Sequence, residues 1–171
     1  FGGTGVNFEV VPTAHRGHAA DLARDAAEDG VELVVAAGGD GTVNEVGRSL
    51  IGTNAVLGLL PIGSGNAFAR ALGVPINPGR ACRALLNAQV RRIDVGRICD
   101  RYFFSTAGIA LDAEVCWRYD RRQGSRRGFL PYVWLTAHSF LSYTPAEVTF
   151  TLDGDRTFRA SPVVATIANT A

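Results

Sequence analysis

Nearly continuous apolar runs alternate with amphipathic stretches through the first half of the chain. Residues 31–37 (VELVVAA) and 55–60 (AVLGLL) are apolar throughout, which is typical of strands covered on both faces. Helices are predicted over 18–29, 43–51, 66–72 and 77–89, and strands over 6–11, 31–37 and 55–60. Strands and helices that alternate through short connections predict an α/β fold, with a mostly parallel sheet and helices on both faces.

The pattern changes after Val90. It predicts strands over 91–98 and 101–109, a helix over 130–142, a hairpin of 146–152 with 157–160, and a strand over 163–167. Asp153-Gly154 is a strong hairpin-turn signal, and we favour a turn over a catalytic role for Asp153-Gly154-Asp155. We therefore expect an α/β domain over 1–90 that lacks its first strand, followed over 91–171 by the start of an incomplete antiparallel β domain.

Composition narrows the function classes. The chain has 171 residues, a net charge of +1 and 47% hydrophobic residues, so it has a globular composition and lacks the basic excess of a nucleic-acid binder. Its three cysteines form neither a metal-ligand pattern nor a disulfide framework, which favours a reducing cytoplasm. No apolar run reaches the roughly 20 residues that span a bilayer. Because the chain begins at Phe1 without Met, we expect it to be part of a longer one.

A glycine-rich turn, Gly38-Gly39-Asp40-Gly41, follows the first apolar run and leads into a predicted helix. Open α/β sheets bind ligands at the carboxyl ends of their strands. Glycines let backbone amides approach phosphate oxygens, and the helix N-terminus adds a partial positive charge. Asp40 is either a turn residue or a carboxylate that serves phosphoryl transfer, through a metal or the attacking hydroxyl; the spacing alone leaves both open.

A second glycine turn, Gly63-Ser64-Gly65, follows the second apolar run and again opens a helix. Two such units in succession predict two anion-binding turns side by side at one edge of the sheet. One turn would hold phosphates while the other borders the nucleoside.

The two segments GGDGTVNEV and PIGSGNAFARALG together resemble the paired signature of the diacylglycerol kinase catalytic domain family, which includes bacterial lipid kinases and is related to sphingosine and ceramide kinases. The resemblance runs from about Thr13 to Ala171. It implies transfer of the γ-phosphoryl group of ATP, with Mg²⁺, to a lipid hydroxyl such as that of diacylglycerol. The family's nucleotide-binding residues match Thr13, Gly39, Asp40, Gly41, Thr42, Val43, Asn44, Glu45 and Ser64, with Asp40 as the catalytic candidate.

The match departs from the family pattern in places. Ser64 stands for the usual threonine and keeps its hydroxyl, Gly65 is an insertion-like difference, and Ala67 replaces a common aspartate. The family's first strand and its Asn-Pro-x-Ser-Gly loop would precede Phe1. The general base would lie beyond Ala171, so we expect this chain alone to be catalytically incompetent.

Other interpretations stay open. An NAD kinase-like enzyme shares the GGDGT loop, although the second motif argues against it, and a nucleotide-binding regulator without catalysis is a further alternative. Five arginines in residues 118–127, followed by aromatic residues, either form a solvated loop or settle on a membrane surface that presents the lipid. The sequence does not fix the lipid or the oligomeric state, and a homodimer is compatible with it.

Overall fold

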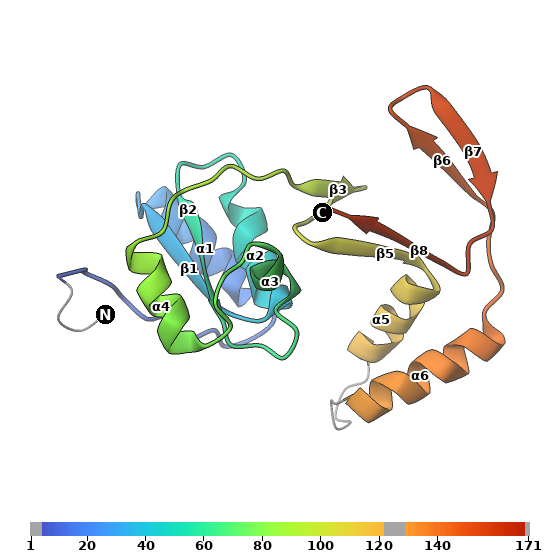
Figure 1. The fold of residues 1–171 in the computed structure, drawn as a ribbon, viewed down its shortest axis with the longest axis horizontal. Helices are drawn as coiled ribbons and strands as arrows, with labels where there is room; N and C mark the ends of the chain where they lie inside the picture. The colour runs from blue at the N-terminus through green and yellow to red at the C-terminus, as the bar shows by residue number, and fades with distance from the viewer. Residues whose placement is uncertain (1–4, 122–128, 170–171) are drawn as a thin grey trace. The chain divides into compact units, whose positions relative to one another are not determined.

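The computed structural model describes residues 5–121 and 129–169, and these separate into two compact units (Figure 1). The first unit extends to Ser105 and also takes in Asn169, and the second is Thr106–Ala168. The predicted boundary after residue 90 stays a prediction for the domains of the whole protein. Each unit is described by itself below.

The first unit is built on a parallel strand pair. Its elements are α1 (His18–Glu28), β1 (Leu33–Gly38), α2 (Asp40–Leu50), β2 (Val56–Pro61), α3 (Ala67–Ala71), α4 (Pro78–Leu86), β3 (Gly96–Ile98) and β4 (Arg101–Phe103). β1 and β2 pair in parallel from Leu33↔Val56 to Gly38↔Pro61, so both strands end at the same edge. β3 and β4 form a short antiparallel hairpin.

Helices cover both faces of this strand pair, as the sequence predicts. Ala36 and Leu59, which are register neighbours, point into a core shared with α1, α2 and α3. Successive strand residues face opposite sides. Gly58 therefore faces α4, where a Cβ on it would lie 3.2 Å from Leu85 Cδ2. In Figure 1, α4 (bright green) accordingly lies on the other side of the strands from α1 and α2.

Local capping signals explain where two helices start and stop. Gly30, at φ 79°, follows α1, and the N–H groups of Gly30 and Val31 bond to the carbonyls of Ala27 and Ala26. That is a Schellman arrangement, which glycine permits because it adopts positive φ without strain. At the start of α4, Asn77 Oδ1 accepts a hydrogen bond of 3.1 Å from Arg80 N.

The second unit combines antiparallel strands with two helices. Its elements are β5 (Thr106–Ala110), α5 (Leu111–Arg121), α6 (Phe129–Ser142), β6 (Val148–Leu152), β7 (Arg156–Ala160) and β8 (Val164–Ala168). β6 and β7 form the predicted hairpin, and β5 pairs antiparallel with β8. Leu111, Val115 and Leu135 form a small core between the two helices.

Three sequence predictions differ from the structure. Residues 6–11 are exposed and form no strand, because no neighbouring strand pairs with them in the described part of the chain. The strand predicted over 91–98 is confined to β3, and that over 101–109 is divided into β4 and β5. Helix α5 was not predicted at all.

Candidate functional site

The first glycine turn places an uncapped helix N-terminus at the end of β1. Gly39 is the N-cap residue of α2 and has no side chain with which to cap it. The N–H groups of the first helical turn, residues 40–42, therefore have no partner within the helix. Together with the helix dipole, they favour an anion at this point.

The second glycine turn lies directly against the first. Ile62 N donates a hydrogen bond of 3.1 Å to Gly38 O, continuing the strand pairing into the turns. A Cβ added to Gly63 would lie 2.4 Å from Gly39 Cα and 3.0 Å from Gly39 N. Only glycine at Gly63 allows the two backbones to approach this closely. The structure thus confirms that both turns lie side by side at one edge of the sheet.

Asp40 connects the two turns through its carboxylate. Its Oδ2 accepts a hydrogen bond from Ala67 N and its Oδ1 one from Phe68 N, both at 3.0 Å. Asp40 thus caps the start of α3, although it lies in the first turn of α2. Each carboxylate oxygen has a second lone pair, so these bonds still leave Asp40 able to accept from, or coordinate, a ligand. Asp40 therefore has a structural role at the start of α3, and this role is compatible with a chemical one.

Asn66 is a site residue that the sequence reasoning missed. It is 3% exposed, and its φ of 53° lies in the left-handed region. Its Oδ1 accepts from Gly63 N at 3.1 Å while its Nδ2 donates to Gly63 O at 2.7 Å. Asn66 thereby fixes both polar groups of the residue that touches Gly39. An asparagine directly after Ser64-Gly65 was the available signal, since asparagine tolerates positive φ better than most residues.

Of the remaining candidates in the first motif, some lie at the glycine turn and others pack in the core. Thr42 lies over Gly38, where a Cβ would come within 2.4 Å of Thr42 Oγ1. Val43 is 5% exposed in the core, and its N–H bonds to Gly39 O at 3.1 Å. Asn44 is half-buried and Gly41 is exposed with nothing near its absent Cβ.

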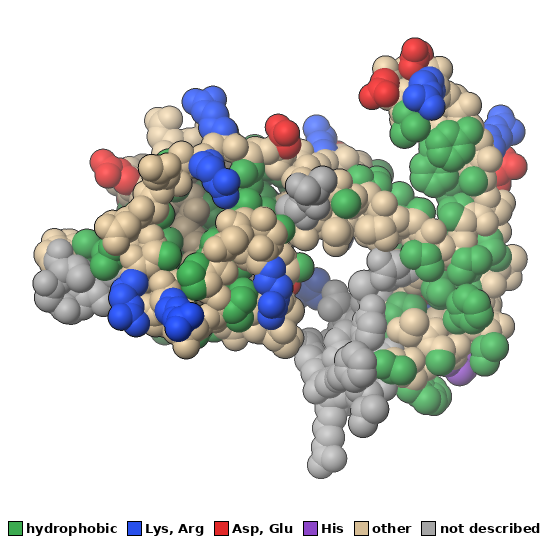
Figure 2. All heavy atoms as spheres, in the orientation of Figure 1, with side chains coloured by type: hydrophobic (Ala, Val, Ile, Leu, Met, Phe, Trp, Pro, Cys, Tyr) green, Lys and Arg blue, Asp and Glu red, His purple; other side chains and the backbone are tan. Residues whose placement is uncertain are grey.

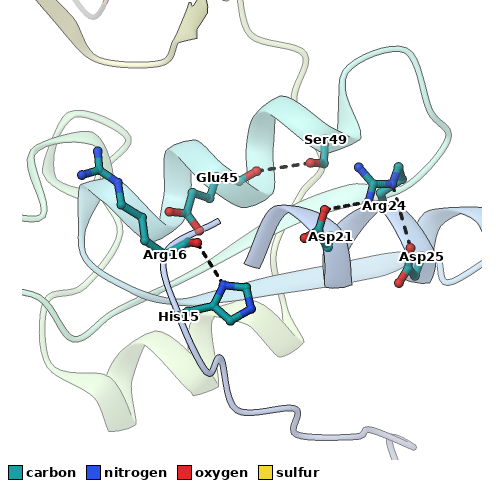
Figure 3. Close-up of polar contacts among 7 residues, drawn as sticks. All are labelled: His15, Arg16, Asp21, Arg24, Asp25, Glu45 and Ser49. Carbon is teal, nitrogen blue, oxygen red and sulfur yellow. Dashed lines mark hydrogen bonds and ion pairs between the residues drawn. The ribbon is translucent and has the colours of Figure 1, made fainter. Parts of the chain in front are cut away.

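Glu45 holds the chain segment that precedes α1. Its Oε1 accepts a hydrogen bond of 3.0 Å from Gly17 N, the N-cap residue of α1. Figure 3 shows Glu45 extending from α2 to this segment beside Arg16. Thr13 is exposed four residues before Gly17 and Ser64 is exposed in the second turn. Ser64 is next in sequence to Gly63, which lies against Gly39, and the contributions of Ser64 and of Thr13 to the site both stay predictions.

Neither a metal cage nor a membrane span is found within residues 5–121 and 129–169. No three His, Cys, Asp or Glu residues of that region gather in a way that could hold a metal ion. No helix there is both long and apolar enough to cross a bilayer.

Comparison with known proteins assigns this site to a family. Residues 2–98 match the family model of the diacylglycerol kinase catalytic domain. The chain is 34% identical to the diacylglycerol kinase of Bacillus subtilis, over 83% of this chain and 48% of that protein. It is 42% identical to a protein of Chromohalobacter salexigens named "Probable lipid kinase YegS-like", over 65% of this chain and 37% of that protein.

A solved structure shows the same relationship. The crystal structure of a diacylglycerol kinase from Bacillus anthracis has a TM-score of 0.68 and 27% identity to this chain, covering 92% of this chain and 51% of that one. The chain spans about half the length of these relatives, or less. Since the family model matches more than half of the chain and includes both glycine turns, the chain belongs to the diacylglycerol kinase catalytic domain family.

Proposed function

We propose that the protein is an ATP-dependent lipid kinase that transfers the γ-phosphoryl group to a lipid hydroxyl such as that of diacylglycerol. One observation supports the proposal most directly: two glycine turns meet backbone to backbone beside the uncapped N-terminus of α2. Oriented N–H groups at a helix N-terminus suit the phosphates of a nucleotide. The family membership supports the same nucleotide and the same class of acceptor.

The residues at this edge fit a nucleoside triphosphate. The absent Cβ atoms of Gly39 and Gly41 leave the backbone open to phosphate oxygens, and the N–H groups of residues 40–42 donate to them. Ser64 and Thr13 offer hydroxyl groups that border the nucleotide. Arg70, whose Nε donates to Gly65 O at 3.1 Å, brings a positive charge to the second turn, and the helix dipole and a bound cation supply the rest of the charge compensation.

Asp40 has the chemistry to complete the site. A bound Mg²⁺ neutralises charge on the transferring phosphoryl group. Asp40 would hold that ion, or would accept the hydrogen bond of the attacking hydroxyl and so orient the hydroxyl toward the phosphorus atom. The proton of that hydroxyl passes to a general base as the phosphoryl group is transferred.

ATP binding tests the nucleotide site on the chain itself. Isothermal titration with ATP and Mg²⁺ is expected to show one site, which Gly63→Ala weakens and which Arg101→Gln, an exposed change in β4, leaves intact. Absence of ATP binding by the unmodified chain would overturn the proposal.

Phosphoryl transfer tests the acceptor on the whole protein. Radiolabelled ATP is offered with diacylglycerol and with NAD in parallel reactions, and label is expected in the lipid. Label in NAD would instead establish the NAD kinase-like activity, and ATP binding without transfer to either acceptor would favour a nucleotide-binding regulator.

A further inference from the structure

Charge is divided unequally along the first unit. Between Val46 and Ile93 there is no acidic residue at all, whereas six arginines occur: Arg48, Arg70, Arg80, Arg83, Arg91 and Arg92. The preceding stretch has the opposite balance, with eight acidic residues between Glu9 and Glu45 against Arg16 and Arg24. The net charge of +1 for the whole chain conceals this division.

The fold places the acidic residues of α1 and the arginines of α4 on opposite faces of the strand pair. On α1 the exposed side chains include Asp21, Asp25 and Glu28. On α4, Ala81 is fully buried, and Leu85, one turn later, packs over Gly58 of β2. Positions 80, 83 and 86 therefore form the outer face of α4. Figure 2 shows blue arginine side chains spread over this side of the unit, with few red ones among them.

We name the α4 surface by six residues: Arg80, Arg83, Leu86, Val90, Arg91 and Arg92. Its guanidinium groups have no carboxylate partner in the described part of the chain. Arg83 Nε donates to Gly79 O at 3.3 Å and Arg91 donates to Leu72 O at 3.5 Å. These neutral acceptors hold the side chains without cancelling their charge, so the positive charge remains available to a partner.

Two apolar side chains that lie between these arginines in the sequence are exposed. Leu86 is 41% exposed and Val90 is 72% exposed. Arginine next to exposed aliphatic side chains suits a bilayer interface, where the charge meets anionic headgroups while the aliphatic groups enter the acyl boundary. Nucleic acid would use the charge alone and would gain nothing from Val90.

We propose that the α4 surface docks the protein on anionic lipid bilayers, with the acidic α1 side turned away from the membrane. The choice of a lipid surface rests on the proposed function, because a kinase that acts on diacylglycerol must reach a substrate embedded in a bilayer. The opposite charge of the two faces orients the unit as well as attracting it, since the acidic face is repelled by the same headgroups.

Vesicle co-sedimentation without nucleotide tests the proposal. Phosphatidylcholine vesicles with and without phosphatidylglycerol are compared for the unmodified chain and for Arg80→Gln with Arg83→Gln. Each arginine near an anionic surface is worth about fivefold in affinity, so the double variant is expected to bind roughly 25-fold more weakly to the anionic vesicles. Val90→Ser is expected to weaken binding further, and raised salt to weaken it in every chain.

The matched control is Arg24→Gln with Arg48→Gln, which removes the same charge from exposed positions on α1 and α2. Binding that survives in the control but falls in the α4 variant supports the proposal. The proposal would be overturned by equal losses of binding in both variants, or by a lack of binding to anionic vesicles at low salt. It would also be overturned if the chain bound duplex DNA but not vesicles, and Val90→Ser left the DNA binding unchanged. ATP titration of the α4 variant is expected to match the unmodified chain, so a failure here is distinguishable from a failure of the kinase proposal.

Discussion

The carboxylate of Asp40 accepts a hydrogen bond of 3.0 Å from the backbone N–H of Phe68, 28 residues further along the chain. Phe68 is 2% exposed, and its ring meets that of Phe104 edge to face, with 5.7 Å between centroids. The motif aspartate is thus joined through one backbone bond to the core of the unit. A change at Asp40 should therefore affect the stability of the fold as well as any chemistry.

Replacing Asp40 is expected to lower the free energy of unfolding. Asp40→Ala leaves the N–H groups of Ala67 and Phe68 without their charged acceptor, at a cost of about 1.5–3 kcal/mol. Asp40→Asn keeps one acceptor oxygen and should lose less. Urea unfolding followed by circular dichroism gives the values, with Asp25→Ala on the exposed side of α1 as a control that changes little. A stable Asp40→Ala protein would show that the carboxylate matters only for ligands.

A methyl group at Gly63 is expected to separate the two turns. The added Cβ would lie 2.4 Å from Gly39 Cα, and a backbone atom cannot move aside as a flexible side chain can. Gly63→Ala should cost about 1–3 kcal/mol in stability and weaken ATP binding at least roughly tenfold.

Gly41→Ala is the control for Gly63→Ala, because it adds the same methyl group at a position with room for it. No atom beyond its chain neighbours and its own helix backbone lies within 4 Å of a Cβ at Gly41, which is a helical position. Alanine there should raise the free energy of unfolding by about 0.5–1 kcal/mol. Equal destabilisation by both methyl groups would mean that the contact between the turns is not what requires glycine at Gly63.

Features that depend on neighbouring residues were predictable from the sequence. The C-terminus of α1 at Gly30 and the N-cap Asn77 are fixed by local backbone chemistry. The β6–β7 turn has positive φ at Asp153 and Gly154, which is the reason an Asp-Gly pair signals a hairpin. The apolar runs of β1 and β2 likewise predicted the parallel pair that brings both glycine turns to one edge.

Features that depend on distant residues were not predictable in the same way. The partners of Asp40 and of Glu45 lie about 28 residues away, so no local pattern indicates which N–H groups they accept from. Residues 6–11 have strand-like composition, but a strand also requires a partner. Helix α5 was missed because its charged residues alternate with its apolar ones and it runs directly into an arginine-rich stretch, of which residues 122–128 lie outside the described chain.

Substitutions at Asn66 separate backbone strain from lost hydrogen bonds. Asn66→Gly keeps the left-handed conformation but loses both bonds to Gly63, whereas Asn66→Ala loses the same bonds and must also hold a φ of 53°. The alanine variant should be less stable than the glycine variant by about 1–2 kcal/mol. Unfolding experiments on both variants measure the difference. Equal stability would show that the turn relaxes to another conformation once the side chain is removed.

Substitutions at Glu45 test whether the segment that contains Thr13 is held for the nucleotide. Glu45→Gln keeps a side-chain oxygen for the N–H of Gly17, so it should retain most of the stability and of the ATP affinity. Glu45→Ala removes the acceptor and should cost about 1–2 kcal/mol in stability. Because it also releases the segment before α1, it should weaken ATP binding, whereas Glu9→Ala, at an exposed position earlier in the same segment, should not. If Glu45→Ala is destabilised while its ATP affinity, measured well below its unfolding temperature, is unchanged, then Glu45 anchors α1 alone and Thr13 takes no part in the site.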